Sequence, residues 1–151
     1  MSGMRYRDGG AKYWEDFEKP KIVWQAISKR IAFAYDASGE YYCDVTTFFM
    51  TGENLKYILA ILNSKIFEYA LLNIYLEGDT FKSKNAIIHN FPIPPVRDAE
   101  TDKLVDIIDK IISIKHNNPS ADISKWEDEI DRLVYQLYGL TEEEIKIVEQ
   151  L

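Results

Sequence analysis

The sequence predicts an α+β domain, in which a small antiparallel or mixed β-sheet packs on a long helix and a C-terminal helical segment follows. Three observations lead to this fold class. Residues 21–50 are rich in β-branched and aromatic residues and are interrupted by turn signals. Residues 51–76 carry apolar side chains at three- and four-residue spacing, and the same helical period returns from residue 98 onward.

Three strands are expected in the first part of the chain. The segments "KIVWQAIS" (21–28) and "IAFAYD" (31–36) suit strands because β-branched and aromatic residues pack well on a pleated surface. The residues "DASG" (36–39) predict a turn, with Asp to begin it and Gly for a positive φ angle. The segment "EYYCDVTTFFM" (40–50) returns as a third strand. An antiparallel hairpin is therefore expected.

A single amphipathic helix is expected over residues 51–76. Thr51 or Asn54 can cap its start, and Gly78 ends the segment. Residues 78–95 then read as a loop that closes in the proline-rich stretch "PIPP". This stretch cannot be helical, because proline lacks a backbone N–H and restricts the residue before it.

The rest of the chain is predicted to be helical. One apolar stripe precedes a break at "HNNPS" (116–120), and a second stripe follows it. Gly139 lies where a C-terminal cap glycine belongs, and Thr141 with Glu144 predicts a capping box for a last short helix. The stripes comprise Leu104, Ile107, Ile108, Ile111 and Ile112, and then Ile123, Trp126, Ile130, Leu133, Val134 and Leu137.

Charge divides the chain unevenly. The net charge of the 151 residues is −7, but residues 1–97 sum to +1 and residues 98–151 to −8. Such a balance argues against a nonspecific polyanion binder, although it leaves room for a local basic face on the first part. The single cysteine allows no internal disulfide, and no signal peptide or membrane span is seen. We therefore expect a cytoplasmic protein that has no membrane partner.

No specific catalytic constellation is found. There is no glycine-rich phosphate loop, and His89 and His116 lack partners at metal-ligand spacing. Cys43 is expected to be a small strand residue rather than a nucleophile, because no histidine lies nearby in the sequence. Glu144 and Lys146 match only a fragment of a nuclease site. We expect no catalytic residue, no metal and no cofactor in this chain.

Basic and amide side chains cluster at the predicted turns. Arg and Lys can contact phosphates or guanine edges, and Gln or Asn can pair with adenine, so these side chains are candidate DNA contacts. Solvation alone would also explain charges at a hairpin. The candidates are Gln25, Ser28, Lys29, Arg30 and Tyr42 in the strand region, and Lys82, Lys84 and Asn85 in the loop.

Several motifs of the sequence resemble those of a known protein family. They are "KPKIVW", "F-x-YD-x-x-G-x-YY", "TG-x-x-LKYILAILNSKIFEY" and "PIPP", and the tail "EIDRLVYQLYGLTEEEI" looks like the helical segment that commonly follows. Over about residues 13–147 the chain resembles the TaqI-like C-terminal specificity domain of type II and related (IIG) restriction–modification DNA methyltransferases. The motif "LKYILAILNSKIFEY" followed by "PIP" is its most specific part.

The resemblance implies a target-recognition domain with a fold similar to that of type I specificity subunits. Such a domain grips double-stranded DNA beside a methyltransferase domain, generally adenine-N6 specific and in some enzymes fused to an endonuclease. That domain binds S-adenosylmethionine and flips the target base out of the stack. Its motifs are missing from this sequence. On this basis residues 4–97 are expected to be the recognition domain, and residues 98–151 an acidic helical segment that packs on it or on the methyltransferase domain.

A second function stays open at this point. The acidic helices could instead form a protein–protein docking or dimerisation module that does not read DNA. Their apolar stripes, represented by Ile107, Ile111, Trp126, Ile130 and Leu133, would supply the interface.

Overall fold

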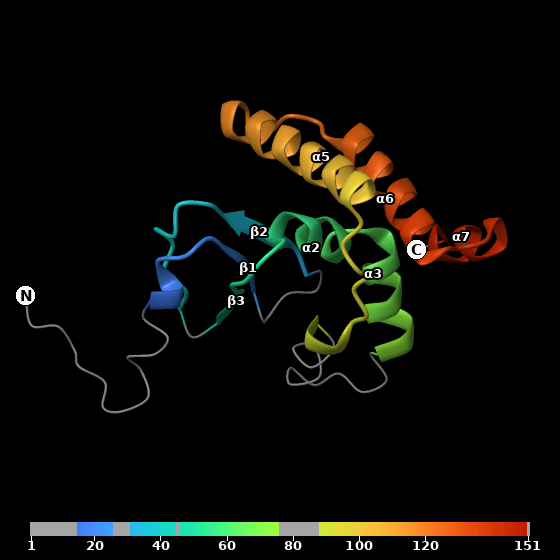
Figure 1. Cartoon of the computed structure of the whole chain (residues 1–151), viewed down its shortest axis with the longest axis horizontal. Coiled ribbons are helices and arrows are strands. Elements are labelled where there is room, and N and C mark those ends of the chain that lie inside the picture. The colour runs from blue at the N-terminus through green and yellow to red at the C-terminus, as the bar shows by residue number, and fades with distance from the viewer. Residues whose placement is uncertain (1–14, 26–30, 45, 76–87, 151) are drawn as a thin grey trace, which may run out of the picture. The chain divides into compact units, whose positions relative to one another are not determined.

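The computed structural model describes residues 15–25, 31–44, 46–75 and 88–150 (Figure 1). The chain divides into two compact units, residues 1–55 and residues 56–151. Strands occur in the first unit and helices make up most of the described second unit, so the α+β fold class is confirmed. The division of function between residues 4–97 and 98–151 stays a prediction.

The first unit contains a three-stranded antiparallel sheet. Its strands are β1 (Lys21–Gln25), β2 (Phe33–Asp36) and β3 (Thr47–Met50), in the order β2-β1-β3. Both edge strands therefore pair with β1 and not with each other. The predicted third strand begins only at Thr47, because the backbone N–H groups of Tyr41 and Thr46 donate to aspartate side chains.

Aromatic side chains join the three strands on one face of the sheet. Trp24 lies opposite Phe33 on β2 and Phe48 on β3, and its ring centroid is 5.6 Å and 6.1 Å from theirs. Trp24 and Phe33 are buried. Cross-strand aromatic pairs of this kind stabilise a sheet beyond the apolar area that they bury.

A buried ion pair closes the opposite end of β1. Lys21 and Asp36 face each other across β1 and β2, and the Lys21 Nζ donates to Asp36 Oδ2 at 2.5 Å and to the Phe17 carbonyl oxygen at 2.8 Å. Both side chains are almost completely excluded from solvent. An unpaired charge at this depth would be strongly destabilising, so each residue requires the other.

The Asp36 carboxylate also organises the turn that follows β2. It accepts hydrogen bonds from the Ser38 hydroxyl and from the backbone N–H groups of Ser38, Gly39 and Tyr41. Burial opposes its ionisation, but the hydrogen bonds from Lys21, Ser38, Tyr41 and Gly39 outweigh burial and lower the pKa of Asp36 to about 2. The predicted turn is thus confirmed, with a structural role for Asp36 that the sequence pattern did not reveal.

Only glycine fits at position 39 of this turn. Its φ angle is +72°, and a Cβ atom built on it would lie 2.2 Å from the carbonyl oxygen of Glu18. Both the backbone angle and the space therefore require glycine.

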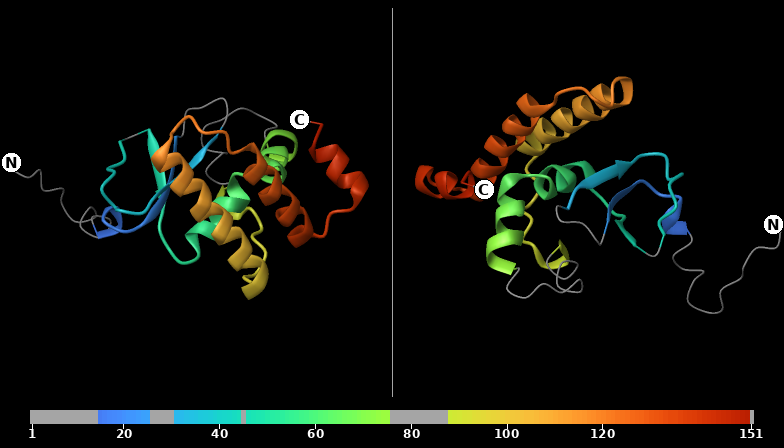
Figure 2. Two further views of the ribbon diagram at one scale, coloured as in Figure 1. Left: turned by 90° about the horizontal axis from the view of Figure 1, so that it is seen from above. Right: turned by 180° about the vertical axis from the view of Figure 1, so that it is seen from behind.

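The prediction of one continuous helix over residues 51–76 is wrong, because the segment is divided into three helical elements. The structure has α2 (Leu55–Leu62), α3 (Lys65–Ala70) and a π-helical turn, η1 (Leu71–Tyr75), and α2 and α3 run in different directions (Figures 1 and 2). Ser64 between them is extended, with ψ at 156°. The Lys65 backbone N–H donates at 2.8 Å to the buried carboxylate of Asp131, which caps the start of α3 from a distant helix.

The predicted C-terminal helices are confirmed. They are α5 (Asp98–Asn117), α6 (Ser124–Tyr138) and α7 (Glu142–Val148), with α5 and α6 side by side in both figures. Gly139 ends α6 with a left-handed φ of 67°, and Thr141 and Glu144 form the predicted capping box. The proline-rich segment before α5 is held by two tyrosines, because the Tyr57 and Tyr138 hydroxyls donate to the carbonyl oxygens of Pro94 and Pro92.

We predict that the sheet loses about 2 kcal/mol of unfolding free energy as the pH falls from about 5 to about 1 because of Asp36. The folded pKa of about 2 lies below the ordinary 3.8, so the stabilisation is complete above the ordinary pKa and is lost as the pH falls through the folded one. Urea unfolding followed through the amide NMR signals of β1–β3 at several pH values measures it.

The variant Asp36→Asn isolates this effect from the titration of other carboxylates. At neutral pH it leaves the buried Lys21 charge uncompensated, so a loss of about 3–5 kcal/mol is expected, and the deficit should narrow in acid. Asp44→Asn is the matched control, because Asp44 accepts similar hydrogen bonds but is exposed. An Asp36→Asn variant as stable as the wild type would contradict the role of the pair.

We also predict that Gly39→Ala is much more destabilising than Gly139→Ala. The two glycines have nearly equal positive φ angles, but nothing lies within 4 Å of a Cβ at position 139. The backbone angle alone costs about 1–2 kcal/mol, and the contact with Glu18 adds to it only at position 39. Local hydrogen exchange of each unit would measure the two losses, and equal losses would show that the steric argument is wrong.

Candidate nucleic-acid interface

Two of the eight predicted DNA contacts lie in the described part of the chain. These are Gln25 and Tyr42, both in the first unit and both exposed. The other six, Ser28, Lys29, Arg30, Lys82, Lys84 and Asn85, lie outside the described residues, and their role stays a prediction.

Gln25 is the last residue of β1. It is exposed and pairs in register with Thr47, the first residue of β3. Because side chains alternate along a strand, Gln25 points away from the face on which Trp24 packs. Its amide therefore stands at the end of the central strand, directly before the segment that carries Lys29 and Arg30 in the sequence.

Tyr42 lies beyond the other end of β1. The neighbouring Tyr41 donates its backbone N–H to Asp36, which pairs with the first residue of β1. The Tyr42 ring stacks on Phe17 with a centroid distance of 6.1 Å, yet 62% of the residue remains exposed. Gln25 and Tyr42 therefore lie toward different ends of β1, and the strand of five residues separates them.

A hydrogen-bonded cluster of polar side chains precedes β3 at the Gln25 end of the sheet. The hydroxyls of Thr46 and Thr47 both donate to the Asp44 carboxylate, at 2.7 Å and 2.9 Å. The Thr46 side chain is the main cause of the lowered pKa of Asp44. Each hydroxyl donates its proton to Asp44 and keeps its acceptor lone pairs, and Asp44 is an acceptor of the kind that binds the cytosine amino group. The sequence analysis missed this cluster, although Asp with Thr two and three residues later is typical of such a turn.

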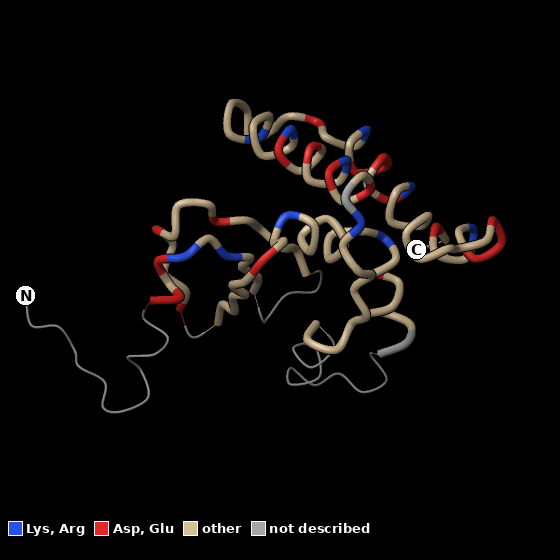
Figure 3. The backbone as a smooth tube through the Cα atoms, viewed as in Figure 1, with Lys and Arg blue, Asp and Glu red and all other residues tan. Residues whose placement is uncertain are grey.

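The positive charges of the described first unit are already paired. Its lysines are Lys19, which pairs with Asp16 at 2.7 Å, and the buried Lys21. Figure 3 colours the Lys and Arg positions blue and the Asp and Glu positions red along the backbone. The remaining basic residues of this unit stand at positions 5, 7, 12, 29 and 30 in the sequence. Those residues supply five of the seven cations with which the first unit could contact phosphates.

The described residues contain no group of His, Cys, Asp and Glu that could hold a metal ion. His89 and His116 are both exposed. Burial raises the pKa of the half-buried Cys43 thiol, which makes its nucleophilic thiolate less available. In the described part of the chain, no helix has the length and apolar character needed to cross a membrane.

Comparison with known protein families gives a match over residues 4–93, to a family described as the TaqI-like C-terminal specificity domain. The matched region includes the three strands, α2, α3 and η1, and ends in the proline-rich segment before α5. None of the curated proteins with which the chain was compared matches it.

Proposed function

Because the chain belongs to the family of TaqI-like C-terminal specificity domains of restriction–modification systems, we propose that it reads the base sequence of duplex DNA. The observation that carries the proposal is the family match over residues 4–93, which is more than half of the chain. In this proposal the domain selects the site, and a methyltransferase domain that binds S-adenosylmethionine modifies a flipped adenine.

The sheet of the first unit supports such a role through its rigidity. Direct readout needs donors and acceptors that are held in place before the DNA arrives, because ordering them on binding would cost affinity. The Trp24 packing, the Lys21–Asp36 pair and the Asp44 cluster fix both ends of β1. The exposed side chains of Gln25 and Tyr42 are thus carried on a stiff support.

Charge indicates which part of the chain should face the phosphates. Residues 98–151 carry a net charge of −8 and would be repelled by a polyanion. Residues 1–97 are close to neutral and carry the Lys29–Arg30 pair together with Lys82 and Lys84. We therefore assign backbone contacts to these four cations and base contacts to the amide and hydroxyl side chains beside them.

We predict that the fourfold alanine variant at Lys29, Arg30, Lys82 and Lys84 loses affinity for all duplex sequences. Each lost phosphate contact should also lower the slope of log affinity against log salt by about one. Fluorescence anisotropy of the whole chain with labelled duplex DNA, from about 50 mM to about 200 mM salt, measures both quantities.

The matched control removes four lysines from the acidic segment, at positions 103, 110, 125 and 146. It changes the net charge equally, so an equal loss of affinity would mean that only total charge matters. Unchanged affinity and slope in the first variant would count against DNA reading by this surface.

We predict that Gln25→Ala changes sequence preference rather than general affinity. A glutamine amide that pairs with adenine discriminates against a wrong base by about 1–3 kcal/mol, and alanine would lose this at one base position only. Selection from a random duplex pool, with wild type and variant in parallel, shows the preference. Glu53→Ala, another exposed residue of the first unit, is the control, and identical selected sequences for Gln25→Ala and wild type would exclude Gln25 as a base contact.

A further inference from the structure

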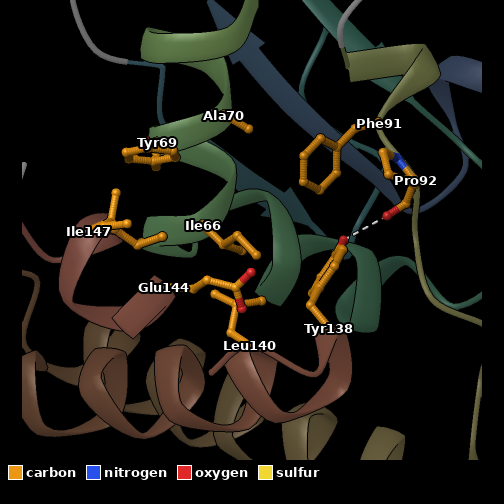
Figure 4. Close-up of a pocket in the computed structure, with 10 residues that line it drawn as sticks. Ile66, Tyr69, Ala70, Phe91, Pro92, Tyr138, Leu140, Glu144 and Ile147 are labelled. Carbon is orange, nitrogen blue, oxygen red and sulfur yellow. Dashed lines mark hydrogen bonds between the residues drawn. The ribbon is translucent and has the colours of Figure 1, made fainter. Parts of the chain in front are cut away.

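A pocket of about 380 Å³ opens in the second unit between α3, the end of α6, α7 and the start of the proline-rich segment (Figure 4). Half of its lining residues come from the region that the family match covers, and half from the acidic helices beyond it. They are Ile66, Tyr69, Ala70, Phe91 and Pro92, and then Tyr138, Leu140, Glu144, Ile147 and Val148.

The inner wall of the pocket offers apolar contact and few polar partners. The Tyr138 hydroxyl donates to the Pro92 carbonyl oxygen at 2.7 Å, as the dashed line in Figure 4 marks. The Glu144 carboxylate accepts from the Thr141 backbone N–H in the capping box. Seven of the ten lining residues are Ile, Leu, Val, Ala, Phe or Pro, and Tyr138 and Glu144 already make hydrogen bonds inside the chain, so the pocket favours an aliphatic or aromatic group.

The pocket also differs from the apolar stripes that the sequence analysis offered as a docking surface. Ile107, Ile130 and Leu133 of those stripes are buried inside the second unit, so they are not available to a partner. Ile147, in contrast, lies at the pocket with 49% of the residue exposed. Ile111 and Trp126 of the stripes are half-buried, so Ile147 is a more exposed apolar contact than any of the five stripe residues.

Charge around the mouth distinguishes the possible occupants. Residues 142–149 hold four glutamates against one lysine, and the whole segment 98–151 carries −8. DNA would be repelled, and a second copy that presented its own acidic segment would bring the same negative charge to the contact. A protein segment that presents an apolar side chain flanked by lysine or arginine satisfies both the pocket and its rim.

We propose that this pocket seats an apolar side chain from a basic amphipathic segment of a partner protein domain. The glutamates of α7 attract the flanking cations, and the wall formed by Ile66, Phe91 and Ile147 encloses the apolar anchor. This inference does not depend on DNA reading, because the residues that carry it are different from the proposed DNA contacts.

The test measures binding of two labelled synthetic peptides to the whole chain by fluorescence anisotropy. One is a leucine–lysine peptide that forms an amphipathic helix, and the other has glutamate in place of every lysine. We expect the lysine peptide to bind and the glutamate peptide not to bind. Ile147→Asp should weaken binding at least about tenfold, as expected for loss of a central contact, and Glu142→Gln with Glu143→Gln should weaken it less.

The matched control is Val96→Asp, because Val96 is a similarly exposed apolar residue (45%) of the second unit that does not line the pocket. It should leave binding within about twofold of wild type. Equal losses in Ile147→Asp and Val96→Asp, equal binding of both peptides, or no binding of the lysine peptide would overturn the proposal. So would a wild-type dimer in sedimentation that Ile147→Asp dissociates, since the occupant would then be a second copy.

Discussion

The structure of the first unit depends on one buried ion pair. Lys21 and Asp36 are cross-strand neighbours, so a slip of one residue between β1 and β2 would leave two charges buried without partners. Each ion loses its hydration on burial, and the pair adds less to net stability than its Coulomb attraction suggests. Its main effect is to fix the pairing of the strands and, through the other hydrogen bonds of Asp36, the turn that follows.

Local sequence patterns predicted those features that neighbouring residues alone determine. The strand positions of β1 and β2, the turn at Asp36–Gly39, the cap at Gly139 and the box of Thr141 and Glu144 belong to this class. The break at Ser64 was missed because the apolar period runs through it unchanged. What stabilises it is Asp131, 66 residues away from Lys65 in the chain, and no local pattern contains that information.

The candidate interface could be predicted only by residue type. The sequence identified Gln25 and Tyr42 as side chains with hydrogen-bonding groups. The structure places Gln25 at the end of β1 and Tyr42 in the segment between β2 and β3. The sequence did not show that Lys21 is buried or that the Asp44 carboxylate binds two threonine hydroxyls, because both depend on the way the strands pair. The acidic helices were predicted correctly. The sequence did not predict which of their apolar residues stay exposed, because the packing of the helices determines this.

The turn after β2 has a consequence for how this scaffold can diversify. Asp36 holds Gly39 and Tyr41 only through their main-chain amides, which every amino acid except proline possesses. Tyr41 is 71% exposed, and its side chain takes no part in the hydrogen bonds by which Asp36 fixes the loop. Such a position can accept new chemical groups through mutation while the underlying architecture persists, which is what a recogniser needs if it is to acquire a new target without refolding.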